Sequence, residues 1–187
     1  MEATLTRIVA ALVLVVPALL VSTSAQAVIP YCNTTWGSLA KSSTATANPS
    51  AAPSDLLGVR SGTHGCYDRL VLDVDGSSHG YRVEYVDQVR ADGSGTVVPT
   101  AGGARLLVIA VAPAYDDAGR ATYRPTDRAK LTDVTGHHTF RQVTWAGSFE
   151  GRTTLGVGVR ARLPFRVFTL AGPEDSSRIV IDVARYW

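Results

Sequence analysis

From Leu56 onward, short segments of apolar and polar residues dominate the chain. Tyr81–Val86 alternates between the two kinds, which is typical of a strand with one face toward solvent. Arg105–Ala112 is a nearly continuous apolar run, which fits a strand buried on both faces. In Thr153–Arg160 two glycines alternate with apolar residues, so one face of that strand lacks side chains. Further strands are predicted at Leu57–Arg60, Tyr67–Asp75, Phe140–Trp145, Phe165–Leu170 and Arg178–Val183.

Two of these predicted strands are near copies of each other. Arg69–Val74 reads RLVLDV, and Arg178–Val183 reads RIVIDV. In extended conformation the first, third and fifth residues of each copy face away from the second, fourth and sixth, so Arg, Val and Asp share one face. A chance resemblance between β-branched runs is the alternative. We interpret the copies as two matched core strands that pair or occupy pseudo-symmetric positions.

Helical periodicity is missing from the same region. No segment after Leu56 sustains apolar residues at i, i+3, i+4 and i+7, and the best helical candidate is a short turn around Thr126–Leu131. Short strands about ten residues apart with Gly-rich turns are typical of an all-β sandwich or barrel. We expect an all-β, single-domain antiparallel β-sandwich with short loops over residues 56–187.

The N-terminal residues have the composition of an export signal. Arg7 precedes an apolar run from Ile8 to Val21, and Ala25-Gln26-Ala27 supplies the small-residue ending of a cleavage site. The run is shorter than the about 20 residues that a membrane span needs. We therefore predict a signal peptide at residues 1–27 and no stable membrane span after its cleavage, with an uncleaved anchor as the alternative.

A polar segment separates this signal from the predicted β domain. Residues 28–55 contain Tyr31 and Trp36, followed by a stretch made almost wholly of Ser, Thr, Ala, Asn and Pro. Such a stretch has little apolar surface to bury, so a flexible N-terminal arm is expected. Cys32 and Cys66 are the two cysteines of the chain, and in an exported protein they indicate one disulfide. The alternative, a two-cysteine metal site, lacks a neighbouring Cys-x-x-Cys or His-x-His spacing.

Composition and motifs exclude several functions. The formal net charge of +2 comes without a basic run, so nucleic acid is not an expected partner. We find no Gly-x-Ser-x-Gly, no phosphate-binding loop and no complete calcium loop, and we expect no cofactor or metal. Glu150 is the best lone general acid, although a strand-end salt bridge is the simpler interpretation. His137 and His138 are expected to be solvated turn residues.

A non-catalytic binding face is the remaining candidate. The Arg and Asp of each repeated strand suit cross-strand ion pairing on a sheet surface. They also suit polymer binding, because aromatic rings stack on sugars while Arg binds carboxylate or phosphate. The candidate binding residues are Tyr67, Arg69, Tyr81, Arg82, Tyr85 and Arg178.

Several of these segments together resemble a known family. Gly62–Val71, Gly80–Val86, Ser148–Gly151, Leu163–Phe168 and Arg178–Val183 are similar, in this order, to the AMIN-like domain of secreted actinobacterial proteins. The resemblance implies a β-sandwich. By analogy with AMIN domains proper, it also implies a non-catalytic module that localises to the cell envelope through peptidoglycan.

The expected function combines export with this resemblance. We expect a secreted or extracytoplasmic protein, associated with the cell envelope, that binds peptidoglycan or another wall polymer and is not an enzyme. A protein–protein interaction module that binds an envelope protein is the alternative. A hydrolase that uses Glu150 with one histidine is the third hypothesis.

Overall fold

The fold is described by a computed structural model that covers residue 32, residues 35–44 and residues 54–187. The expected signal peptide, Tyr31 and residues 45–53 of the expected arm lie outside the described residues. The described part of the chain contains nine strands: β1 (Lys41–Thr44), β2 (Leu56–Thr63), β3 (Tyr67–Val74), β4 (Gly80–Val86), β5 (Ala104–Ala110), β6 (Phe140–Phe149), β7 (Arg152–Val159), β8 (Phe165–Ala171) and β9 (Ser177–Ala184). The described residues form no helix, and none of them builds an element that could cross a membrane as a helix.

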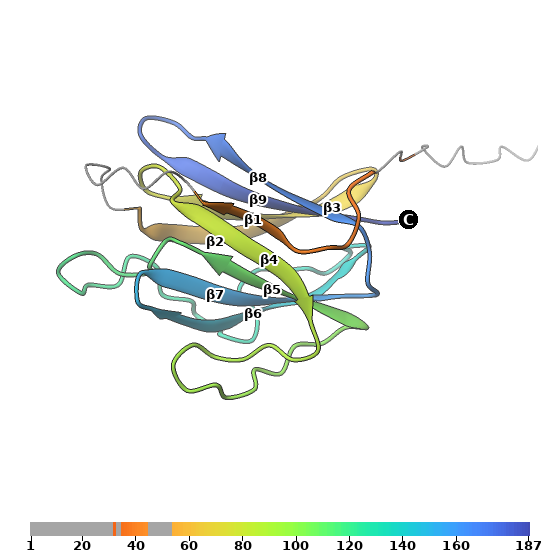
Figure 1. The fold of residues 1–187 in the computed structure, drawn as a ribbon, viewed down its shortest axis with the longest axis horizontal. Coiled ribbons are helices and arrows are strands. Elements are labelled where there is room, and N and C mark those ends of the chain that lie inside the picture. The colour runs from red at the N-terminus through yellow and green to blue at the C-terminus, as the bar shows by residue number, and fades with distance from the viewer. Residues whose placement is uncertain (1–31, 33–34, 45–53) are drawn as a thin grey trace, which may run out of the picture.

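The strands form two antiparallel sheets that lie face to face (Figure 1). One sheet has the order β1-β4-β5-β7-β6, and the other has the order β2-β3-β9-β8. Side chains on the inner faces of both sheets build one core, with Leu70, Val108 and Ile181 fully buried. The predicted all-β antiparallel sandwich is therefore confirmed. The region around Thr126–Leu131 forms a turn closed by the Lys130 N–H donating to the Asp127 carbonyl.

The repeated strands are direct neighbours in the four-stranded sheet. β3 pairs with β9 so that Val71 lies opposite Val180, which is its own counterpart in the repeat. This register places a pseudo-twofold axis at that pair, and it sets the Arg of each strand opposite the Asp of the other. The prediction that the two copies pair in a β architecture is confirmed.

Strand β1 lies inside the segment for which a flexible arm was expected, so that prediction does not hold for Lys41–Thr44. Its backbone pairs with β4, from Lys41 opposite Val83 to Thr44 opposite Gly80. An edge strand of this kind needs backbone partners more than buried side chains. The approach to β1 is also fixed, because the Phe165 N–H donates to the Gly37 carbonyl. In Figure 1, β1 crosses the open side of the sandwich between β4 and β8.

The loop of residues 87–103 covers the outer face of the five-stranded sheet over β7 and β6. Gly156 and Gly158 make this close approach possible. A Cβ atom at Gly158 would lie 1.7 Å from the Ala101 carbonyl oxygen, and one at Gly156 would lie 2.8 Å from the Thr100 hydroxyl. The face without side chains that the sequence predicted is therefore the surface on which this loop rests.

Asp68 ties the two sheets together at one end of the sandwich. Its carboxylate is fully buried on the inner face of β3. One oxygen, Oδ2, accepts hydrogen bonds from the Thr139 hydroxyl at 2.6 Å and from the Thr139 and Phe140 backbone N–H groups at the start of β6. These bonds hold the end of one sheet against the other, next to the disulfide-bonded Cys66.

Candidate binding surface

The candidate binding surface lies on the outer face of the four-stranded sheet, around one buried carboxylate. The register brings Arg69 of β3 and Arg166 of β8 to either side of Asp182 of β9. Arg69 donates two hydrogen bonds to the Asp182 carboxylate, at 2.7 and 2.9 Å, and Arg166 donates a third at 2.9 Å. Asp182 is fully buried, whereas the side chains of Arg69 and Arg166 are 23% and 40% exposed.

Three aromatic rings surround the two arginines. The Arg166 guanidinium lies 4.4 Å from the ring centre of Trp36, 5.5 Å from that of Tyr67 and 5.0 Å from that of Phe168. The Arg69 guanidinium also lies over Tyr67 and Phe168, at 5.2 and 5.6 Å. Such contacts each contribute about 0.5–2 kcal/mol and hold the cations in place. We call Trp36, Tyr67, Arg69, Arg166, Phe168 and Asp182 the Arg–aromatic cluster.

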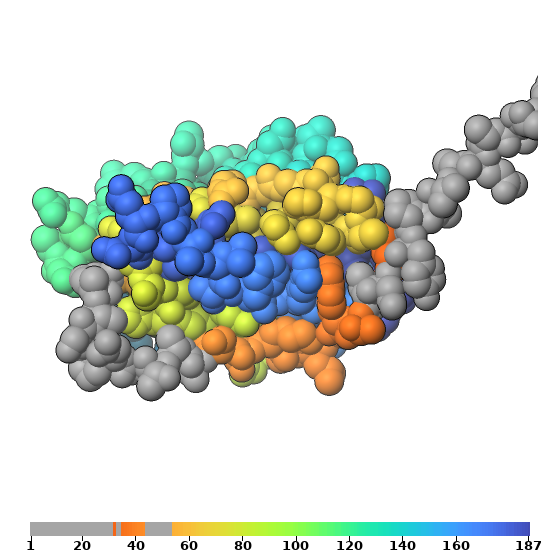
Figure 2. Space-filling model, turned by 90° about the horizontal axis from the view of Figure 1, so that it is seen from above, coloured from red at the N-terminus to blue at the C-terminus, as the bar shows by residue number. Residues whose placement is uncertain are grey.

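The disulfide brings Trp36 into this cluster. Cys32 is bonded to Cys66, with Cα atoms 5.5 Å apart, which confirms the predicted pair. Cys66 immediately precedes Tyr67, and Trp36 meets the Tyr67 ring edge-on at 5.7 Å. The bond therefore helps to hold the segment of residues 35–44 against the sheet. In Figure 2 this segment, in orange, runs along β8, in blue, on the side of the molecule that also shows β2 and β3 in yellow.

The cluster carries more positive than negative charge. Hydrogen bonding to Asp182 raises the pKa of Arg69, because the carboxylate stabilises the charged guanidinium. One carboxylate serves two guanidinium groups, so one positive charge remains without a counterion in the cluster. Because Arg166 is the more exposed arginine, this charge is offered to solvent beside aromatic rings.

A second charged row crosses the same face on the other side of Val71 and Val180. Asp73 accepts two hydrogen bonds from Arg60, at 2.8 and 3.0 Å, so its carboxylate is committed to an ion pair. Arg178, one of the predicted binding residues, instead donates to the Ala171 carbonyl at 2.7 Å. The row that contains Asp73 and Arg178 therefore has different partners from the row that contains Arg69 and Asp182. The described aromatic rings gather at the row of Arg69 and Asp182.

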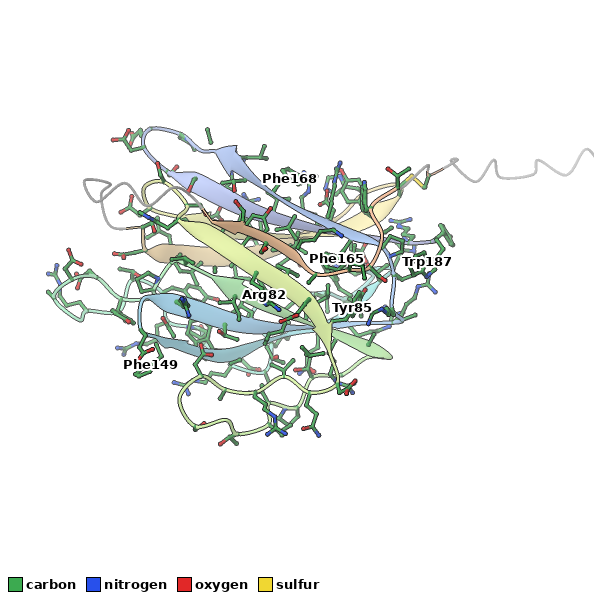
Figure 3. The ribbon with its side chains drawn as sticks, viewed as in Figure 1. Arg82, Tyr85, Phe149, Phe165, Phe168 and Trp187 are labelled. Atoms are coloured by element: carbon green, nitrogen blue, oxygen red, sulfur yellow. A yellow bond between two sulfur atoms is a disulfide. The ribbon has the colours of Figure 1, made fainter. Side chains whose placement is uncertain are left out.

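The six predicted binding residues are divided between the two sheets. Tyr67, Arg69 and Arg178 share the outer face just described. Tyr81 and Tyr85 lie on β4, where their hydroxyls donate to the Val167 and Leu163 carbonyls. Burial raises the pKa of both phenols. Arg82 projects from the outer side of β4, where it forms an ion pair with Glu84 (Figure 3).

Four members of the cluster were not among the six candidate binding residues, namely Trp36, Arg166, Phe168 and Asp182. A signal for two of them was present in the sequence. Alternation along Phe165–Leu170 places Arg166 and Phe168 together on the face opposite the buried Phe165. The missing information was the pairing of β8 with β9, which brings that face beside Asp182.

The other candidate chemistry lies elsewhere. Glu150 occupies the turn between β6 and β7 with a φ of 48°, in the left-handed region. His138 is exposed, as expected, but His137 is not a solvated residue. Its ring stacks on Phe140, and both ring nitrogens are shielded from solvent. Within the described part of the chain, no three His, Cys, Asp or Glu side chains are grouped so that they would hold a metal ion.

Comparison with known proteins agrees with this fold. The model of the AMIN-like domain family matches residues 54–185, which include every strand from β2 to β9. Neither the curated proteins nor the solved structures contain a significant match. The match covers most of the chain and all of the sandwich apart from β1, and the chain therefore belongs to the AMIN-like domain family.

Proposed function

We propose that this protein is a non-catalytic module of the cell envelope that binds peptidoglycan or another wall polymer through the Arg–aromatic cluster. The AMIN-like family suggests association with the envelope and peptidoglycan. Export through the N-terminal signal would place the domain on the correct side of the membrane. The proposal combines this location with the chemistry of the outer face of β3, β9 and β8.

The observation that carries the proposal is the position of Arg166. Its guanidinium is held by Asp182 and lies against three rings, yet 40% of its side chain remains exposed. A wall polymer offers both groups that such a site binds. Sugar rings stack on aromatic faces, and carboxylate or phosphate groups accept hydrogen bonds from guanidinium. Because Asp182 fixes both arginines before binding, little side-chain entropy is lost when the polymer binds.

A non-catalytic role is supported by the surroundings of Glu150. The surface hollow that Glu150 lines has a volume of about 310 Å³, and Asp92, Arg152 and Thr154 are among its other lining residues. No histidine lines it, so an acid–base pair of Glu150 with a histidine has no support in this arrangement. The family match points the same way, because AMIN-like domains are generally binding modules.

The test is co-sedimentation of the purified protein with insoluble peptidoglycan at low salt. We expect retention of the native protein and clear loss of retention for Arg166→Gln. The matched control is Arg82→Gln, which removes the same charge from an exposed ion pair on the other sheet. Retention of both variants at the native level would exclude the cluster as the binding surface. Failure of the native protein to sediment at low salt, where charges are least screened, would refute polymer binding.

A further inference from the structure

A second surface site lies on the opposite sheet, in a groove of about 720 Å³ over β6. One wall is the loop of residues 87–103, which contributes Val89, Val97 and Pro99. The other wall contains Trp145 of β6 and the turn at Arg128 and Ala129. We call this hollow the β6 groove. It shares no lining residue with the Arg–aromatic cluster.

Gln142 holds the two walls at a fixed separation. Its side-chain Oε1 accepts a hydrogen bond from the Ala101 N–H at 2.6 Å, and its Nε2 donates to the Ala129 carbonyl at 2.8 Å. The second wall is also hydrogen-bonded to the sheet, because the Trp145 backbone N–H donates to the Arg128 carbonyl at 2.8 Å. With both walls tied to β6, the groove is formed before any ligand binds.

Three polar side chains inside the groove, those of Gln142, Thr100 and Thr144, already have partners. Both ends of the Gln142 amide bond the walls, and the Thr100 and Thr144 hydroxyls bond each other at 2.9 Å. A sugar ring placed here would lose water from its hydroxyls without gaining equivalent hydrogen bonds, which is unfavourable. The valine and proline side chains of the loop instead favour a ligand with small apolar groups.

Positive charge is concentrated at the rim of the groove. Arg105 and Arg128 line it together with one acidic residue, Asp87. Arg128 is exposed and has no ion-pair partner among the described residues, while Arg105 donates to the Thr100 carbonyl through Nε. Two guanidinium groups beside apolar walls complement a ligand that joins a carboxylate to small apolar side chains.

We propose that the β6 groove binds the carboxyl-terminal end of a short peptide with small apolar side chains. The apolar residues of the peptide lie along Val97 and Pro99, and its terminal carboxylate bonds Arg128. This site is independent of the proposed polymer-binding cluster, because it lies on the other sheet and uses different residues. The protein would then bind two chemically different ligands on its two faces.

The experiment is a titration of the ¹⁵N-labelled protein, followed by backbone amide shifts, with two forms of N-acetylated tri-alanine. One form has a free terminal carboxylate, and the other has a terminal amide. We expect shift changes at residues 97–101 and 142–145, with the amide form binding about tenfold more weakly because it lacks the charge-assisted hydrogen bond. Arg128→Gln should weaken binding of the free acid to a similar extent and leave the amide form unaffected.

The matched control is Arg124→Gln. Arg124 is an exposed arginine of the loop that contains Arg128, but it does not line the groove. This variant should bind both forms as the native protein does. Equal binding of the acid and the amide would refute the role of Arg128, and absence of shifts at the groove at millimolar peptide would refute the site. Stronger shifts at the groove with an N-acetylglucosamine oligomer would overturn the peptide assignment in favour of a saccharide. These outcomes leave the sedimentation test of the Arg–aromatic cluster untouched.

Discussion

Gly158→Ala should destabilise the domain, although alanine is normally preferred to glycine inside a strand. The added Cβ would lie 1.7 Å from the Ala101 carbonyl oxygen. Ordinary contact would require a displacement of about 1.5 Å or more. β7 is held between β5 and β6, so the loop at Ala101 has to move instead. Overpacking of this kind costs about 1–3 kcal/mol, which outweighs the usual gain of about 0.5–1 kcal/mol from replacing glycine.

Thermal unfolding of Gly158→Ala beside Gly62→Ala measures this effect. Gly62 is also in a strand, but a Cβ there meets no atom within 4 Å, so its replacement should be neutral or slightly stabilising. For a domain of this size each kcal/mol corresponds to about 3–5 °C in Tm. The Gly158 variant should therefore melt several degrees below the Gly62 variant, with shifted amide resonances at residues 97–101. Equal Tm values with unchanged resonances would show that the loop does not rest on β7.

Four further predictions concern single side chains. Asp182→Asn should lower the free energy of unfolding by about 2–4 kcal/mol in a urea titration, because two guanidinium groups lose their carboxylate but stay partly solvated; an unchanged midpoint would contradict it. Cys66→Ser should cost about 3–4 kcal/mol through the lost cross-link, and a reducing agent should then have no further effect on its Tm. Asp55→Asn should raise Tm at pH 7, because burial and then nearby aspartates raise the pKa of Asp55. The ionised carboxylate therefore destabilises the native fold, and this loss of stability disappears as the carboxyl is protonated. The higher Tm of the asparagine variant should vanish near about pH 3, and a difference in Tm that is independent of pH would refute the reasoning. Glu150→Asn should raise Tm slightly, since asparagine tolerates the left-handed φ of this two-residue turn, whereas an equal or lower Tm would argue against strain there.

Much of the fold could be predicted from alternation alone. Leu70, Leu72 and Val74 were placed on one face of a strand, and all three are fully buried in the core. The repeat also predicted that β3 and β9 correspond. Strand β1 could not be found in this way, because Lys41–Thr44 has no apolar residue and its structure depends on the exposed backbone of β4. Patterns of side chains report burial, and an edge strand can form without it.

The binding surface was only partly predictable, because residues on one face of a strand do not reveal which strands lie beside it. Tyr67 and Arg69 lie on the same face of β3, as alternation along that strand requires. Tyr81 and Tyr85 are tyrosines of a predicted strand, as Tyr67 is, but they belong to the other sheet. Their hydroxyls bond the backbone near β8. Trp36 reaches the cluster through a disulfide, which is a contact that strand periodicity does not encode.

The repeat also explains why the outer face of the four-stranded sheet is positive. Antiparallel pairing about Val71 and Val180 sets each repeated arginine opposite a repeated aspartate, so the outer faces of β3 and β9 alone would be neutral in charge. The two edge strands then add one arginine each, Arg60 from β2 and Arg166 from β8, and each bonds an aspartate of the repeat. The charged side chains are thus arranged nearly symmetrically about the pseudo-twofold axis at Val71 and Val180. The aromatic rings are not, because the disulfide brings Trp36 only to the side of Arg166. If charge alone governed polymer binding, Arg60→Gln and Arg166→Gln would weaken it equally; if stacking matters, the loss should be concentrated at Arg166.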